Sequence, residues 1–148
     1  MNDKEFLQYL RDKEDIIEMI NHYAMALDDR KWELLKDLFT ADVRINFGGI
    51  EREGIDDFIE MIKAHLGGCG PSQHLFSNYR ITVDGDRATA AFYGRVMHAG
   101  VGKQKDVLFD FWGEYRDELI RTPDGWRTCK RSQRPFHITG DISILKGA

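Results

Sequence analysis

The first part of the chain has apolar residues at helical spacing. Between residues 15 and 30 they recur every three or four positions, which is typical of an amphipathic helix with one buried face. At about 3.6 residues per turn, Asp28 falls at the edge of this face and Asp29 points away from it. The pattern predicts a helix that ends with an inward-facing carboxylate. Its apolar stripe consists of Ile16, Ile20, Tyr23 and Leu27.

Three further elements are predicted before residue 71. Residues 31–39 have helical spacing again, and residues 42–47 alternate like a strand. Gly48 and Gly49 then allow a tight reversal. A third helix follows Gly54 and ends in the glycine-rich segment 67–71. The stripe that this helix buries is predicted to be Ile55, Phe58, Ile59 and Ile62.

Beyond Pro71 the pattern changes to long alternating runs. Strands are predicted at 73–83, 87–98, 105–120 and 126–139, with turns between them. Helices followed by antiparallel strands predict a single α+β domain over residues 1–148. In such a domain a curved sheet wraps around its own helices and leaves a cavity at the open end. The last four residues are expected to fray.

Composition and charge narrow the possible functions. The 148 residues are 42% hydrophobic and 31% charged, as in soluble globular proteins, and the net charge of -4 argues against a nucleic-acid partner. No stretch approaches the roughly 20 apolar residues that span a bilayer, and the charged start lacks the pattern of a secretory signal. We therefore predict a cytoplasmic protein without a membrane partner. Cys69 and Cys129 are predicted to be structural thiols, with a disulfide between them as the alternative.

Asp28 and His74 together indicate proton-transfer chemistry. A carboxylate that accepts a hydrogen bond from one imidazole nitrogen fixes the tautomer, and it stabilises the imidazolium that forms when the other nitrogen takes a proton. His74 begins a predicted strand, so it is either a general base or a structural histidine in the core or on the solvated face. Asp28 is either its partner or a helix-terminal acid that pairs with Arg30 or Lys31.

A set of ordered segments covers nearly the whole chain. They are Asp15-Ile16-Ile17, Tyr23 to Asp28, Trp32 to Phe39, Asp42-Val43, Gln73 to Asn78 and Gly125-Trp126-Arg127. In order and spacing they resemble SnoaL-like members of the nuclear transport factor 2-like (NTF2-like) superfamily. The resemblance implies a cone-shaped α+β barrel with a deep pocket between the long helix and the concave sheet, assembled as a homodimer or homotrimer. The superfamily includes dehydratases, a dehydrochlorinase, isomerases, polyketide cyclases and members without catalysis, so the fold alone does not fix the function.

The resemblance can be carried over residue by residue for the elimination enzymes. Scytalone dehydratase, bile acid dehydratase and lindane dehydrochlorinase use an aspartate at the end of the first helix and a histidine opening the third strand, which Asp28 and His74 match. Arg131 matches an arginine of the dehydrochlorinase pattern, but Tyr23 stands where that pattern has a lysine. Bile acid dehydratase has a tyrosine there. This departure favours dehydration over dehalogenation, and ketosteroid isomerase, with its aspartate base, fits poorly.

The remaining candidates are contacts to a substrate. Tyr23 is either a phenol donor to a substrate oxygen or an aromatic core residue. Arg131 is either an anchor for developing negative charge or a surface residue, because one register slip would turn it outward. The period of two places Phe76 and Asn78 on the strand face of His74. With Trp112, these two are the predicted substrate-binding residues.

The sequence suggests no cofactor. The histidines lack metal-ligand spacing, and no glycine-rich phosphate motif follows a strand. His98 is a second-rank candidate, since it lies near a strand end and exposure is expected there, while His65 is expected to stabilise a helix end. Abundant aromatic residues predict a small apolar or cyclic ligand, and a strand with two apolar faces predicts an oligomer. The predicted function is a cofactor-independent dehydratase, with an isomerase, a polyketide cyclase or a small-molecule-binding module as alternatives.

Overall fold

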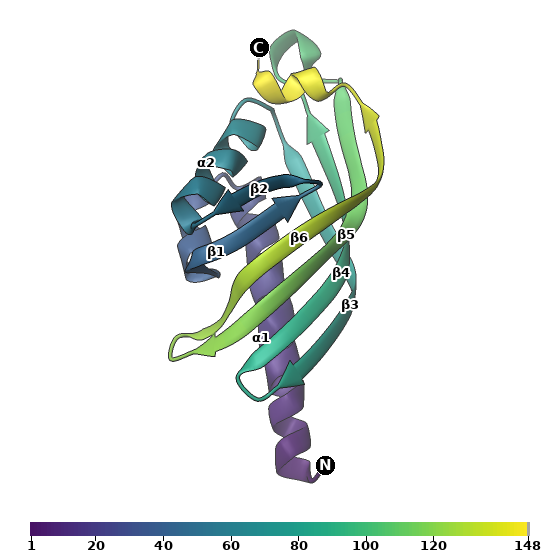
Figure 1. Cartoon of the computed structure of the whole chain (residues 1–148). Coiled ribbons are helices and arrows are strands. Elements are labelled where there is room, and N and C mark those ends of the chain that lie inside the picture. The colour runs from purple at the N-terminus through teal and green to yellow at the C-terminus, as the bar shows by residue number, and fades with distance from the viewer. Residues whose placement is uncertain (148) are drawn as a thin grey trace.

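The computed structural model describes residues 1–147, and Figure 1 shows how their elements are arranged. A long helix, α1 (Asp3–Asp28), and a shorter helix, α2 (Ile55–Leu66), pack against a six-stranded sheet. Short 3-10 helices are found at η1 (Trp32–Asp37), η2 (Gly102–Gln104) and η3 (Ile142–Lys146). The segment 31–39, predicted as one helix, therefore forms η1 and the start of a strand.

The sheet has the strand order β2-β1-β6-β5-β4-β3. All neighbouring strands are antiparallel except β1 and β6, which run parallel. The predicted α+β fold with a curved sheet is confirmed, but the sheet is mixed and is not closed into a barrel, because β2 and β3 form its two edges. The strands are β1 (Phe39–Phe47), β2 (Ile50–Glu53), β3 (Ser72–Asp84), β4 (Arg87–Ala99), β5 (Leu108–Thr122) and β6 (Gly125–Gly140).

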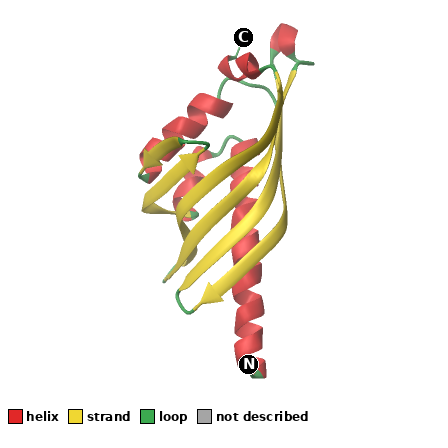
Figure 2. Cartoon of the chain, turned by 45° about the vertical axis from the view of Figure 1, so that its right-hand side comes forward, coloured by secondary structure: helices red, strands yellow, loops and turns green. Residues whose placement is uncertain are grey.

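Helix α1 begins at Asp3 rather than near residue 15. Asn2 caps it: the Asn2 side chain accepts a hydrogen bond from the backbone N–H of Glu5 at 2.9 Å, and the Glu5 carboxylate accepts one from the backbone N–H of Asn2 at 2.9 Å. Figure 2 shows the first turns of α1 extending beyond the end of the sheet. Because these turns bury few side chains, the apolar spacing did not reveal them.

A buried carboxylate fastens the exposed half of α1 to the sheet. Asp12 accepts hydrogen bonds from the Arg121 guanidinium at 2.8 and 3.0 Å and from the Trp126 indole at 3.2 Å. The hydrogen bond from Arg121 lowers the pKa of Asp12, although burial acts in the opposite direction. A buried charge without such partners would cost roughly several kcal/mol. Because Asp12 must stay next to Arg121 and Trp126, this network fixes the position of α1 along its axis.

Glycine turns and the C-terminal segment complete the fold around the site. Gly48 and Gly49 have φ angles of 62° and 98° and form the predicted reversal between β1 and β2. Ile144 and Leu145 of η3 are buried, and η3 contacts α2. The expectation that the chain frays from Leu145 is therefore wrong for that residue, and Ala148 lies outside the described residues.

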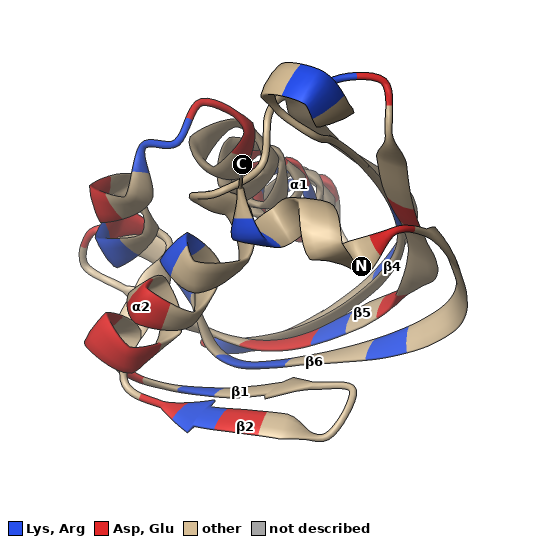
Figure 3. Cartoon of the chain, turned by 90° about the horizontal axis from the view of Figure 1, so that it is seen from above, with Lys and Arg blue, Asp and Glu red and all other residues tan. Residues whose placement is uncertain are grey.

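Both helices lie on the concave side of the sheet, as the view in Figure 3 shows. Helix α2 buries the predicted stripe and adds Leu66 to it. Lysines and arginines are interspersed with acidic residues over helices and strands in this view, in line with the small net charge of -4. No helix within residues 1–147 is long and apolar enough to cross a membrane.

Candidate active site

Asp28 and His74 meet where the end of α1 reaches the start of β3. Nδ1 of His74 lies 2.7 Å from Oδ1 of Asp28, and the backbone N–H of His74 donates to Oδ2 of Asp28 at 2.9 Å. The Asp28 and His74 side chains are only 16% and 5% exposed. The fold therefore brings the two residues of the predicted general base into direct contact, shielded from bulk water.

The hydrogen bonds of this pair define its protonation. Burial alone would raise the pKa of Asp28, but the hydrogen bonds from His74 and from the hydroxyl of Ser72 bring that pKa below its usual value. Asp28 is therefore ionised at neutral pH and can only accept hydrogen bonds. Nδ1 of His74 must then carry the proton that is donated to Asp28. In the neutral form of the imidazole, Nε2 then has a free lone pair.

His74 forms part of the wall of a cavity of about 270 Å³. Both helices and strands β3 to β6 contribute to this cavity, and most of its lining residues are apolar or aromatic. Ile50, Ile138 and Ile142 line it and are also half exposed or more, which places its mouth beside them. The side chains with polar groups along its wall are Tyr23, His65, His74, His98, Tyr115 and Gln133.

Tyr23 reaches the same cavity from α1. Its side chain is buried, and burial raises the pKa of Tyr23, with the charge of Arg131 acting against this shift. The phenol is therefore neutral at any ordinary pH and can donate a hydrogen bond. The ring of Tyr23 lies 6.4 Å from the ring of His74, measured between centroids. A ligand next to His74 would thus have a neutral donor close by.

Arg131 points into the core behind Tyr23. Its Nε and Nη2 each donate to the Asp117 carboxylate at 2.7 Å, and its Cζ lies 4.3 Å from the centroid of the Tyr23 ring. Burial opposes its charge, but Asp117 raises the pKa of Arg131, so the guanidinium stays charged. Arg131 does not line the cavity beside His74. The structure therefore places it against Tyr23 and away from the space where a ligand would bind.

Two of the predicted substrate contacts, Phe76 and Asn78, lie outside the cavity wall. Phe76 packs among the rings around the site, 6.1 Å from His74 between centroids, but does not line the cavity. Asn78 is exposed, with a φ angle of 56°. Between Ser77 and Arg80, β3 has one residue more than its partner β4. This bulge interrupts the alternation, so the prediction that Asn78 lines the cavity is wrong.

Trp112 is also outside the cavity, on the opposite face of the sheet. The Arg95 guanidinium lies 4.9 Å from the centroid of the indole, and the ring of His137 lies 5.5 Å from it. Phe111, the neighbour of Trp112 on β5, does line the cavity. Because adjacent residues of a strand face opposite sides, Trp112 cannot be the predicted substrate contact.

His98 was only a second-rank candidate in the sequence, and the structure gives it a place in the site. It was expected to be exposed, but it is buried and lines the cavity. Its Nδ1 lies 2.8 Å from the carbonyl oxygen of Phe109, so Nδ1 carries a proton and Nε2 is left as an acceptor. Burial lowers the pKa of His98 to about 4, so the imidazole is neutral at physiological pH. Val96 is buried on the same strand, and the period of two from Val96 was the signal that could have placed His98 inside.

His65 was expected to serve only the end of α2, but it also lines the cavity. The residue as a whole is exposed, while the packing around its ring lowers the pKa of His65. Its position is therefore the outer part of the cavity. Three imidazoles from three different elements, those of His65, His74 and His98, thus border one space.

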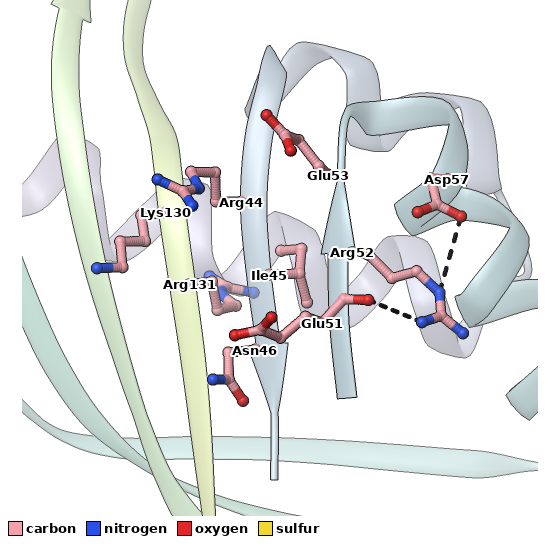
Figure 4. A pocket seen from close by; sticks show the side chains of 9 residues that line it. All are labelled: Arg44, Ile45, Asn46, Glu51, Arg52, Glu53, Asp57, Lys130 and Arg131. Atoms are coloured by element: carbon pink, nitrogen blue, oxygen red, sulfur yellow. Dashed lines mark hydrogen bonds and ion pairs between the residues drawn. The ribbon is translucent and has the colours of Figure 1, made fainter. Parts of the chain in front are cut away.

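A second hollow of about 430 Å³ lies at β1, β2 and β6, and Figure 4 shows the nine residues that line it. Arg44 and Lys130 are cross-strand neighbours here, and Glu53 pairs with Arg44 on its other side. Arg52 lies 3.7 Å from Asp57. This hollow is larger than the one beside His74, but apart from the buried Arg131 its charged residues, of both signs, are mostly exposed, as on an ordinary protein surface. We therefore assign the candidate site to the cavity that contains the Asp28–His74 pair.

The part of the chain that the structure describes holds neither a cluster of metal ligands nor a disulfide. Within residues 1–147, no three or more His, Cys, Asp or Glu side chains are gathered so as to hold a metal ion. Cys69 and Cys129 are both free thiols, as predicted, and the alternative of a disulfide between them is wrong.

Comparison with known proteins identifies the family. A family model described as a SnoaL-like domain matches residues 8–132. The chain belongs to the SnoaL-like family. The uncharacterized protein Rv2910c of Mycobacterium tuberculosis (strain ATCC 25618 / H37Rv) is 32% identical to this SnoaL-like chain over 127 residues, which cover 82% of this chain and 84% of that protein.

Solved structures extend the likeness of this SnoaL-like domain to its fold. An NTF2-like protein with a cystatin-like fold from Novosphingobium aromaticivorans is 25% identical, with a TM-score of 0.76, over 90% of this chain and 87% of that chain. A protein of the same organism, named provisionally as a scytalone dehydratase, is 20% identical, with a TM-score of 0.80, over 95% of this chain and 92% of that chain. The predicted resemblance to the NTF2-like superfamily is thereby confirmed.

Proposed function

We propose that this SnoaL-like protein is a cofactor-independent lyase that dehydrates a small cyclic or polyketide-like hydroxy compound. The observation that carries the proposal is the Asp28–His74 pair, because Nδ1 of His74 is bound to Asp28 while the ring borders an apolar cavity. A base of this kind removes protons from carbon next to a carbonyl group. The fold likeness to a protein named for dehydration is consistent with this reaction but does not establish it.

In the proposed reaction, Nε2 of His74 takes a proton from the carbon next to a substrate carbonyl. Asp28 stabilises the imidazolium that forms, through the 2.7 Å contact with Nδ1. The phenol of Tyr23 donates a hydrogen bond to the carbonyl oxygen as negative charge develops there. The carbon–oxygen bond to the neighbouring hydroxyl then breaks and a carbon–carbon double bond forms. The imidazolium returns its proton to the departing oxygen, which leaves as water.

His98 and Arg131 would assist this reaction in different ways. The free Nε2 of His98 can accept a hydrogen bond from the substrate hydroxyl and so orient it toward the imidazolium of His74. Arg131, which was predicted to contact the substrate itself, would instead support the Tyr23 ring from behind, where its ion pair with Asp117 holds the guanidinium against that ring.

The cavity also limits the class of substrate. Its volume of about 270 Å³ is slightly below the roughly 300–1,000 Å³ typical of pockets for drug-sized ligands. The phenol of Tyr23 and the imidazole of His98 that border it are both neutral, and neither matches a charged group on a ligand. We therefore propose a small, uncharged, mainly apolar substrate that carries one carbonyl and one hydroxyl group.

Dehydration is tested with a panel of small cyclic hydroxy ketones and mass spectrometry of the products. A product lighter by one water supports a dehydratase. A product of unchanged mass with a shifted double bond or a new ring would identify an isomerase or a cyclase that uses the same base. A ligand recovered unchanged at stoichiometric occupancy would identify a binding module and contradict the proposal.

Variants connect such an activity to the site. We expect His74→Gln to abolish turnover, because glutamine cannot accept a proton at neutral pH. His22→Gln is the matched control, since His22 is an exposed histidine of α1 that contacts only Glu18, at 3.8 Å, in the described structure. Full turnover in the His74 variant would show that the base lies elsewhere.

We also propose that the protein forms a homodimer or homotrimer through the outer face of the sheet. Leu75, Tyr93 and Phe136 are exposed on this part of the molecule, and arginines stack on the Tyr93 and Phe136 rings at 4.9 and 4.8 Å. Aromatic residues and arginine are enriched at protein interfaces. Sedimentation analysis is expected to show a species of two or three chains that Tyr93→Glu weakens, whereas a monomer at micromolar concentration would contradict the proposal. The cytoplasmic location stays a prediction.

A further inference from the structure

Arg30 lies directly behind the proposed base. It follows the end of α1 and has a φ angle of 59°, which residues with side chains seldom adopt. Its Nη1 donates to the carbonyl oxygen of Leu27 at 2.8 Å and to Oγ of Ser72 at 2.7 Å, and its Nη2 donates to the carbonyl oxygen of Gly70 at 2.6 Å. One guanidinium therefore joins the last turn of α1, the glycine-rich loop and the first residue of β3.

The hydrogen bonds from Arg30 toward His74 can run in only one direction. A guanidinium has no acceptor, so Ser72 must accept from Arg30, and the hydroxyl proton of Ser72 is then free to be donated to Oδ1 of Asp28 at 3.0 Å. The same carboxylate oxygen accepts the proton on Nδ1 of His74. Ser72 and His74 thus donate to a single oxygen, and Arg30 orients the first of these donors.

We propose that Arg30 is a positioning residue for the Asp28–His74 pair, acting through Ser72 to hold the carboxylate in place and to keep Nε2 of His74 free to accept a proton. The inference rests on the proposed function, because it explains how the proposed base is kept ready to accept a proton. Two effects contribute. The Ser72 hydroxyl partly satisfies the Asp28 carboxylate, which lowers its pull on an additional proton of His74. The positive charge of Arg30 disfavours a second positive charge on the nearby imidazole.

The other titratable groups around the pair leave Arg30 as the charge that sets this balance. Burial raises the pKa of Tyr23 on α1 and of Cys69 in the loop, so both are neutral. On the sheet side, His98 is neutral with a pKa of about 4, and His65 on α2 has a lowered pKa. The charge of Arg131 is matched by its ion pair with Asp117.

The field of Arg30 also extends into the cavity. Its charge is one of the causes, after burial, that lower the pKa of His98. Arg30 is linked to His74 itself through one serine and one carboxylate. The chain of hydrogen bonds from Arg30 through Ser72 to Asp28 therefore carries an electrostatic effect, which a purely mechanical support would not have.

The test follows the protonation of His74 by NMR in the intact protein without substrate, with His74→Gln used to assign its signals. In Ser72→Ala and in Arg30→Met, we expect the pH at which the pair takes up a proton to rise by about one unit. This is a tenfold change, and it requires that the lost interaction favours one protonation state of the pair over the other by about 1.4 kcal/mol. Ser72→Thr, which keeps the hydroxyl, should restore the original midpoint. Arg30→Lys, which keeps the charge without the planar fork, should give an intermediate value.

An unchanged midpoint in both Ser72→Ala and Arg30→Met would overturn the inference. If Arg30→Met does not fold, Ser72→Ala decides alone, because it removes only a hydroxyl group. Failure of the proposed function remains distinguishable. If the protein shows no turnover but the midpoint still moves in the variants, the role of Arg30 and Ser72 is supported and the dehydratase proposal is not. If the protein dehydrates a substrate but the midpoint does not move, the dehydratase proposal is supported and the role of Arg30 is not. Where turnover is found, both variants should lower kcat at neutral pH more than they raise KM.

Discussion

Replacing Asp28 with asparagine tests the proposed base without changing the size of the side chain. The Asp28 carboxylate accepts three hydrogen bonds, from Oγ of Ser72 and from the backbone N–H and Nδ1 of His74. An amide offers one oxygen, and its NH₂ group can only donate. The backbone N–H of His74 cannot reverse its role, so the amide oxygen should take the position opposite that group. The NH₂ group then occupies the former position of Oδ1 and faces Nδ1 of His74.

This exchange should invert the tautomer of His74. In the Asp28→Asn variant, Nδ1 would accept a hydrogen bond from the introduced amide, and Nε2 would carry the proton toward the cavity, where it cannot act as a base. The charge that stabilises the imidazolium is lost as well. We expect kcat to fall by between about 10² and 10⁴, which corresponds to roughly 3–5 kcal/mol in the activation free energy. KM should change little, because Asp28 does not line the cavity.

Two measurements check this prediction. Initial rates with a substrate from the hydroxy ketone panel give kcat and KM, and ¹⁵N NMR of the imidazole distinguishes a protonated Nδ1 from a protonated Nε2. His22→Gln should leave both measurements unchanged, because His22 is exposed and makes no contact with the pair. An Asp28→Asn protein that has the inverted tautomer and wild-type kcat would refute the assignment of His74 as the base.

Three further predictions concern stability. Asp12→Ala should lower the free energy of unfolding in urea by about 2 kcal/mol; this is less than the roughly 3–5 kcal/mol for a fully buried pair, because the Arg121 side chain is 33% exposed. Gly94→Ala should cost about 1–3 kcal/mol and reduce ligand binding, since the added methyl group would meet the Tyr115 ring, and unchanged thermal unfolding would contradict this. The pKa values of Asp12 and Asp28 are lowered from 3.8 in the folded state. Their contribution to the free energy of unfolding is therefore present above about pH 4 and is lost as the pH falls through the lowered pKa values. A melting temperature that stays constant down to about pH 3 would contradict this.

The elements of the fold could be predicted where a pattern repeats over many residues. The apolar stripes of α1 and α2 and the alternation of β3 to β6 all depend on burial against one core, and each stripe contains several residues that agree. The start of α1 could not be predicted in this way. It depends on the cap formed by Asn2 and Glu5 and on the hydrogen bonds between the buried Asp12 carboxylate and the sheet. Neither feature produces a periodic signal.

For the site, positions at element ends were more informative than positions within strands. Asp28 ends α1 and His74 lies near the start of β3, 46 residues later, and the resemblance to a known family is what paired these two ends. His98 stayed a second-rank candidate because its place near the end of β4 suggested exposure, although the rings of His74 and Phe109 pack against it. The burial of a strand end depends on which other segments of the chain pack over it. Alternation along the strand alone carries no information about those segments.

Two β-bulges account for the side chains whose direction alternation misjudged. On β6, Trp126 and Thr128 face the core, so strict alternation would turn Lys130 inward and Arg131 outward. An extra residue between the pairs Leu119↔Thr128 and Glu118↔Lys130 reverses this, and it sets Arg131 opposite Asp117. The bulge in β3 has the opposite consequence, since it turns Asn78 out of the cavity wall. A bulge arises from the pairing of two strands and the twist between them, so a single strand's composition does not reveal it. The bulge in β6 thus places the Arg131 guanidinium against the Tyr23 ring, and the bulge in β3 turns the Asn78 amide away from the cavity.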